Sequence, residues 1–144
     1  MSAPQVTSVE AAHPVDASGR PVAGLAVGCF YLTMAGVHLG IVAADPATYG
    51  AFAEHGLFAF VRDGWRDIVM INPTVWGSLL MLGELTIGVM LVAGGRWARY
   101  GWGMVLGFHA LLLLFGWWVW VWAVPALALA VVLARHDLAQ GGRR

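Results

Sequence analysis

The sequence has little charge, a single cysteine and no lysine. Charged residues make up 11% of the 144 residues and hydrophobic residues 60%, whereas an average soluble domain is about 25% charged. So few charges cannot cover so much apolar surface, which excludes a soluble monomer. All eight basic residues are arginines and eight acidic residues balance them, so we expect no basic surface for nucleic acid. The lone Cys29 excludes a disulfide framework and a multi-cysteine metal site within the chain.

Three long apolar segments occupy residues 21–44, 68–94 and 100–134. A membrane-spanning helix needs about 20 apolar residues, and the third segment would be about 52 Å long as one helix. We therefore expect it to fold back near Gly116. The predicted fold is all-α, an integral membrane four-helix bundle within residues 21–136, with spans at about 21–44, 68–94, 98–115 and 118–134.

Arginine placement predicts the orientation, because cytoplasmic flanks of membrane spans are enriched in basic residues. With four spans, six arginines fall on one side of the membrane, and only Arg62 and Arg66 fall on the other. Both termini are then cytoplasmic, with flexible tails at residues 1–20 and 137–144. We expect a multi-pass protein of a bacterial or archaeal cytoplasmic (inner) membrane. Residues 1–20 lack the basic start of a secretory signal, so the first span should be an uncleaved anchor.

Residues 46–67 connect the first two spans and alternate aromatic with charged side chains. Such a pattern is typical of short amphipathic helices in the headgroup region. We expect an extracytoplasmic interfacial loop, which either covers the outer end of the bundle or simply follows the membrane surface.

Glycines spaced four residues apart predict where helices pack closely, since small residues let helix backbones approach in lipid. The pairs are Gly24 with Gly28, Gly36 with Gly40, and Gly103 with Gly107. Six tryptophans crowd the last two spans, and several should lie at the membrane surfaces as an aromatic belt. Cys29 should be buried in the first span and unreactive.

The most informative residues are the polar ones inside the apolar segments. Glu84 falls near the middle of the second span, where an ionised carboxylate costs about 2.5–3.5 kcal/mol. It should therefore be protonated or paired. His109 lies near mid-depth of the third span, and we expect it to pair with Glu84. His38 and Tyr31 of the first span should extend this polar group outward.

Three interpretations of this polar group remain open. It is either a structural hydrogen bond between helices, or a pocket for a small lipophilic redox partner such as a quinone, or a site where His38 or His109 ligates haem or chlorin. Zinc is disfavoured because the sequence lacks closely spaced ligands. No nucleophile–base arrangement identifies catalytic residues, so the sequence leaves enzymatic activity undetermined.

Residues 82–94, LGELTIGVMLVAG, resemble the second helix of DoxX-like membrane proteins. The resemblance rests on Glu84, on Gly88 four residues later and on the turn at Gly94, and it extends loosely over residues 22–136. It implies a four-helix topology with both termini inside and a role linked to quinone. His38 and His109 are not part of this pattern.

The resulting prediction is a quinone-interacting or accessory subunit of a membrane redox assembly. The alternative is a structural subunit that packs against a larger membrane complex and binds only lipid or pigment. In either case the expected partners are the lipid bilayer and a larger complex or further copies of the chain.

Overall fold

The computed structural model describes residues 22–141. All regular structure within this range is helical, as the sequence predicted. Four long helices are joined by short helical segments, of which η1 and η3 are 3-10 helices and η2 is a π-helix. In chain order the elements are α1 (Val22–Ala44), η1 (Pro46–Gly50), α2 (Ala51–His55), α3 (Ala59–Gly64), η2 (Trp65–Val69), α4 (Pro73–Ala93), α5 (Arg96–Leu112), η3 (Leu113–Phe115) and α6 (Gly116–Gly141).

Asx-Pro pairs set the boundaries next to the connecting segment. The Asp45 side chain accepts a hydrogen bond from the Ala47 amide at 3.1 Å, and Pro46 then begins η1. The Asn72 side chain likewise caps α4, and Pro73 is its first residue. A residue before proline avoids the helical conformation, so each pair interrupts the preceding helix. α4 therefore begins five residues after Ile68, where the second span was predicted to start.

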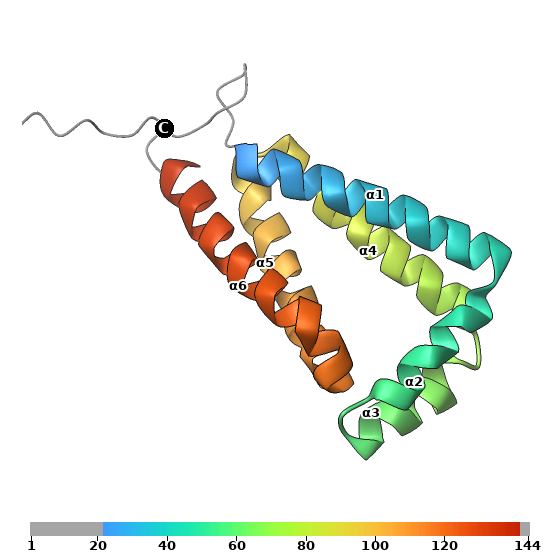
Figure 1. Cartoon of the computed structure of the whole chain (residues 1–144). Helices are drawn as coiled ribbons and strands as arrows, with labels where there is room; N and C mark the ends of the chain where they lie inside the picture. Colours follow the sequence, from blue (N-terminus) through green and yellow to red (C-terminus); the bar gives the residue numbers. More distant parts are fainter. Residues whose placement is uncertain (1–21, 142–144) are drawn as a thin grey trace, which may run out of the picture.

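The chain reverses between α5 and α6 at Gly116, whose φ of 68° and ψ of −173° are accessible only to glycine. α5 and α6 consequently lie side by side and run antiparallel (Figure 1). The predicted reversal near Gly116 is confirmed. Residues 137–141, predicted to belong to a C-terminal tail, are part of α6, which continues to Gly141. The tail predicted for residues 1–20 lies outside the described residues.

The helices form two antiparallel pairs that meet at one end and diverge toward the other (Figure 1). One pair is α1 with α4 and the other is α5 with α6. The short helices α2 and α3 lie at the wide end, where the Leu57 amide donates to the Leu114 carbonyl oxygen at 2.8 Å. Phe52, Trp65 and Phe115 pack together there, with ring centroids 5.1–5.8 Å apart. The connecting segment, which runs from η1 to η2 (residues 46–69), thus joins the two helix pairs at their wide end.

The closest helix contact is between α1 and α4, at Gly28 and Gly88. A Cβ atom on Gly88 would lie 3.0 Å from the Gly28 carbonyl oxygen, which leaves no room for a side chain. Among the described residues, the first of the three predicted glycine pairs packs against neighbouring helices. The pairs Gly36–Gly40 and Gly103–Gly107 meet no atom of these residues within 4 Å of a built Cβ. Spacing alone does not tell which face of a helix has a neighbour, so for these two pairs a packing role stays a prediction.

The main core lies where the four long helices converge. Tyr31, Trp102 and Val105 are its most deeply buried large side chains, each at most 2% exposed. Cys29, predicted to be buried, is exposed on the outside of α1. Trp117 and Trp118 beside the reversal are exposed as well, which is the arrangement expected of belt residues.

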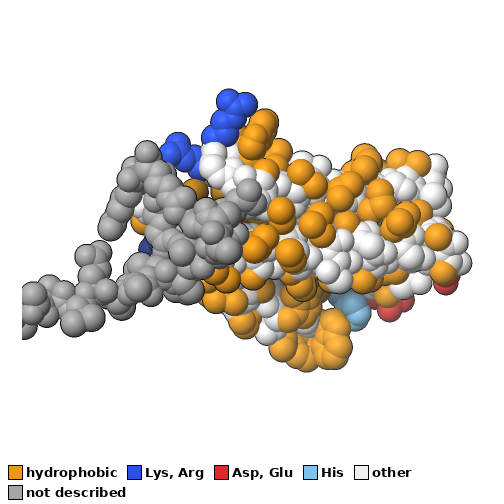
Figure 2. Space-filling view, turned by 90° about the horizontal axis from the view of Figure 1, so that it is seen from above, with side chains coloured by type: hydrophobic (Ala, Val, Ile, Leu, Met, Phe, Trp, Pro, Cys, Tyr) orange, Lys and Arg blue, Asp and Glu red, His pale blue; other side chains and the backbone are white. Residues whose placement is uncertain are grey.

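Within the described part of the chain, three helical stretches are long and apolar enough to cross a membrane. They are Val22–Ala44, Pro73–Ala93 and Arg96–Ala139, the last comprising α5, η3 and most of α6. In a space-filling view, hydrophobic side chains cover the middle of the molecule. The visible arginines gather at one end and the acidic and histidine side chains at the other (Figure 2). On this face the charged side chains lie at the two ends, which is the distribution typical of a protein embedded in a bilayer.

Candidate functional site

Glu84 is buried in the middle of α4, with 3% of its surface exposed. Its Oε1 atom lies 3.6 Å from Nε2 of His38 on α1, slightly beyond hydrogen-bond distance. Its Oε2 atom is buried and has no hydrogen-bond partner. A carboxyl group normally retains its full set of partners when it leaves water, since each unmade hydrogen bond costs about 1–3 kcal/mol. Glu84 therefore lies in an apolar environment with one carboxyl oxygen, Oε2, still able to accept a hydrogen bond.

His38 connects Glu84 to the connecting segment through Tyr49 of η1. Its Nδ1 atom lies 2.7 Å from the Tyr49 hydroxyl oxygen, and the two rings stack at 13° with centroids 5.7 Å apart. Burial, reinforced by the charge of Glu84, raises the pKa of the Tyr49 phenol, which keeps its proton and can donate it to an unprotonated Nδ1. In the neutral imidazole the remaining proton is then on Nε2, the atom that faces Glu84.

Gly77 makes room for Tyr49 against α4. A Cβ atom at Gly77 would lie 2.6 Å from the Tyr49 ring. The Tyr49 carbonyl oxygen accepts a hydrogen bond from the Trp65 indole at 2.8 Å, which ties η1 to η2. The aromatic segment between the first two spans thus fixes the phenol that contacts His38.

Tyr31 and His109 form a second pair, between α1 and α5. His109 Nδ1 is 2.9 Å from the Val105 carbonyl oxygen and 3.3 Å from the Tyr31 hydroxyl oxygen. Because a carbonyl oxygen can only accept, Nδ1 must carry the proton, and Nε2 of the neutral ring is left as an acceptor. Tyr31, like Tyr49, lies within electrostatic reach of the Glu84 carboxyl.

The structure brings all four predicted site residues into one polar cluster but pairs them differently. The predicted Glu84–His109 pair was wrong, because the imidazole near Glu84 belongs to His38, while His109 is bound to Tyr31 and Val105. Tyr49 was missed as a member. Its sequence signal was its position three residues after Pro46, in the turn that follows the end of α1.

A second buried acid, Asp137, was also missed. Its Oδ2 atom accepts a hydrogen bond of 2.6 Å from the Trp102 indole, and its Oδ1 atom is buried without a partner. A Cβ atom on Gly24 would lie 2.9 Å from Oδ2, so this carboxyl packs directly on α1. The available signal was the spacing of Ala130, Ala134 and Asp137, which share one face of α6.

The cluster of Tyr31, His38, Tyr49, Glu84 and His109 offers both hydrogen-bond donors and acceptors in an otherwise apolar environment. Carboxyl, imidazole and phenol groups can each pass a proton, and Glu84, His38 and Tyr49 form a series from mid-helix to the connecting segment. Within residues 22–139, no group of three or more His, Cys, Asp or Glu side chains is arranged to hold a metal ion. The arrangement thus places groups that can donate and accept protons in series within an apolar environment.

Compared with known proteins, the chain matches no family model, no curated protein and no solved structure.

Proposed function

We propose that this protein is a DoxX-like membrane subunit that binds a quinone beside Glu84 and serves a larger redox assembly. The observation that carries the proposal is the buried Glu84 carboxyl, with one oxygen unpartnered and the other only 3.6 Å from an imidazole nitrogen. Asp137 also has one unpartnered oxygen, but its other oxygen accepts a hydrogen bond of 2.6 Å, whereas the other oxygen of Glu84 lies 3.6 Å from the imidazole. A ligand that exchanges hydrogen bonds with Glu84 would supply the missing partner.

A quinone fits the chemistry of this cluster. Its ring and isoprenoid tail favour an apolar environment, and its two oxygens accept hydrogen bonds as quinone and donate them as quinol. When bound, it would carry electrons and protons between the redox partners of the assembly. In this chain Glu84 and Tyr31 would contact the oxygens, and His38 and Tyr49 would lead protons toward the membrane surface.

The proposed topology has four spans, formed by α1, α4, α5 and α6, with η1 to η2 outside the cytoplasmic membrane. α5 has 17 residues, about 26 Å at 1.5 Å per residue, and can nearly cross the roughly 30 Å hydrocarbon core if helped by η3. Arg96, Arg99 and Arg135 then lie at the cytoplasmic end.

The alternative is a structural subunit with no small ligand, and it has one observation of its own. The outward glycine pairs Gly36–Gly40 and Gly103–Gly107 are free for close contact with helices of another chain. In this alternative Glu84 and His38 stabilise the register of α1 on α4 and nothing more.

The experiment is binding of decylubiquinone to the purified protein in detergent, followed by quenching of tryptophan fluorescence. The test variants are Glu84→Leu and Glu84→Gln. The control is Thr86→Val, which removes an outward-facing polar group from the same helix. We expect Glu84→Leu to weaken binding about tenfold, as for loss of one hydrogen bond of roughly 1.4 kcal/mol. The affinity of the Glu84→Gln variant for decylubiquinone should lie between those of Glu84→Leu and the parent.

Stability separates the two functions. For a ligand site, Glu84→Leu should unfold no more easily than the parent, because it removes a buried oxygen that lacks a partner. If Glu84 is only a structural contact, the Glu84→Leu variant should lose about 0.6–1.7 kcal/mol of its free energy of unfolding. A parent that binds no quinone, together with a destabilised Glu84→Leu, would refute the quinone proposal.

A further inference from the structure

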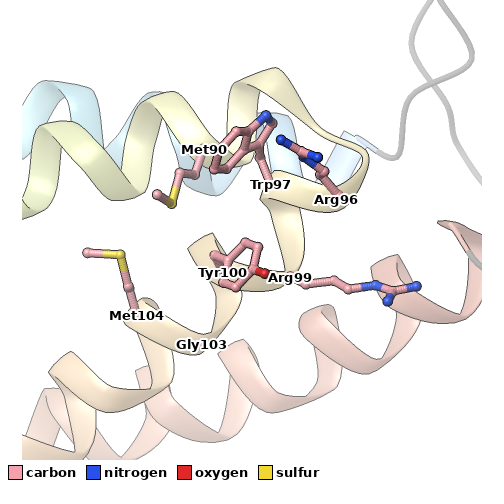
Figure 3. A pocket seen from close by; sticks show the side chains of 7 residues that line it. All are labelled: Met90, Arg96, Trp97, Arg99, Tyr100, Gly103 and Met104. Carbon is pink, nitrogen blue, oxygen red and sulfur yellow. The ribbon is translucent and has the colours of Figure 1, made fainter.

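A groove with a volume of about 720 Å³ lies where α4 ends and α5 begins, at the end of the molecule where the two helix pairs meet. It is separate from the Glu84 cluster, with which it shares no residue. Its lining residues are Met90 of α4 and Arg96, Trp97, Arg99, Tyr100, Gly103 and Met104 of α5 (Figure 3).

One end of the groove is cationic. The Arg96 guanidinium lies over the Trp97 ring, 4.8 Å from its centroid, and Arg99 is one helical turn further along α5. The ion pair found among residues 22–139 joins His38 and Glu84, so neither arginine is neutralised by a carboxylate in that range. Stacking on an indole positions a guanidinium while leaving its N–H groups available to an anion.

The other end of the groove is apolar. Figure 3 shows the thioethers of Met90 and Met104 on the side of the aromatic rings opposite to the two guanidinium groups. Gly103 adds no side chain between them, and nothing lies within 4 Å of where its Cβ would be. Trp97 and Tyr100 are 44% and 62% exposed, as is common for aromatic residues at a membrane surface.

We propose that this groove binds one anionic phospholipid, with the phosphate at the end lined by Arg96 and Arg99 and an acyl chain over Met90, Gly103 and Met104. The charge of the groove is complementary to a phosphate, and basic pockets between membrane helices are suited to anionic headgroups. Its apolar end is continuous with the outward face of α4, where Leu82, Leu85 and Val89 are exposed. A soluble anion would use only the cationic end, whereas a phospholipid uses both.

The test is native mass spectrometry of the full chain from detergent micelles containing equal amounts of phosphatidylglycerol and phosphatidylcholine with identical acyl chains. The parent should retain one phosphatidylglycerol in preference to phosphatidylcholine. Arg96→Gln and Arg99→Gln should each reduce that preference about fivefold, from the contribution of a single arginine near an anionic lipid. Arg66→Gln, an exposed arginine at the opposite end of the molecule, is the matched control and should change nothing.

A second pair of variants tests the apolar end. Gly103→Leu fills the groove and should lower retention of phosphatidylglycerol at least as much as an arginine variant. Gly83→Leu, also at an open helix surface, should not. Unfolding measured by circular dichroism establishes that the compared variants are folded.

Any of four results would overturn the proposal. The first is equal retention of the two lipids by the parent. The second is an effect of Arg66→Gln as large as that of Arg96→Gln, which would indicate general surface charge. The third is no effect of Gly103→Leu, which would mean that the apolar end of the groove does not hold an acyl chain. The fourth is displacement of the lipid by millimolar inorganic phosphate, which would indicate a site for free anions.

Discussion

Two buried acidic residues, Glu84 and Asp137, differ in how their carboxyl groups are satisfied. Asp137 receives a direct hydrogen bond of 2.6 Å from the Trp102 indole, whereas Glu84 has only an imidazole nitrogen at 3.6 Å. A buried carboxylate is costly unless it is hydrogen-bonded. We therefore interpret Asp137 as a residue that joins α5 to α6, and Glu84 as the residue available to a ligand.

The role of Asp137 can be tested through its indole partner. Trp102→Phe keeps an aromatic ring in the core but removes the N–H donor, and we expect a loss of about 1–2 kcal/mol in the free energy of unfolding. The measurement is reversible unfolding in mixed micelles, followed by circular dichroism. Trp97→Phe is the control, because Trp97 lies on the same helix and is exposed.

A double-mutant cycle separates the hydrogen bond from the packing of the ring. Asp137→Asn retains an oxygen acceptor and should cost less than Trp102→Phe. Combining Trp102→Phe with Asp137→Leu should cost less than the sum of the two single changes, because no buried acceptor is left unpaired. Strictly additive losses would contradict a direct hydrogen bond.

Among the helical elements, the closest pairing is that of α1 with α4. It depends on backbone approach at Gly28 and Gly88, because neither position has room for a Cβ. In lipid, apolar burial gives little net drive for association, so such close packing is what holds two apolar helices together. The pairing also places His38 beside Glu84, which makes the glycines important to the site.

We expect Gly88→Ala to destabilise the protein by about 1–3 kcal/mol, because its Cβ would overlap the Gly28 backbone and Leu32. The same change at Gly83, where the surface is open, should leave stability unchanged or raise it by up to about 1 kcal/mol through helix propensity. Thermal unfolding in detergent compares the two. Equal stability of the variants would mean that α1 and α4 do not pack as described.

For the whole molecule, both helix pairs and the connecting segment contribute residues to the polar cluster. Tyr31 and His38 come from α1, Glu84 from α4, His109 from α5 and Tyr49 from η1. A shift of one helix pair against the other would separate Tyr31 from His109. The connecting segment, bonded to η3 through Leu57 and Leu114, resists that shift.

The proposed four-span topology predicts which positions face the same side of the membrane. In a Cys29→Ser background, single cysteines at Asp63 and Trp118 should react with an impermeant maleimide from the outside, and one at Arg135 only from the inside. The measurement uses intact cells and inverted vesicles. If 96–139 crossed as one helix, position 135 would react from the same side as position 63, and position 118 from neither.

Local features of the sequence were enough for the coarse structure. Length, hydropathy and the near absence of charge predicted the all-helical architecture and its apolar helices, and Gly116 predicted the reversal, because each depends on residues close together in the chain. The partners of the polar residues depended on the tertiary structure. α1 and α4 are apolar on every side, so the pattern does not indicate which face turns inward. Only helix rotation and packing decided that Glu84 meets His38 rather than His109, that Tyr49 joins them, and that one glycine pair of three is in contact.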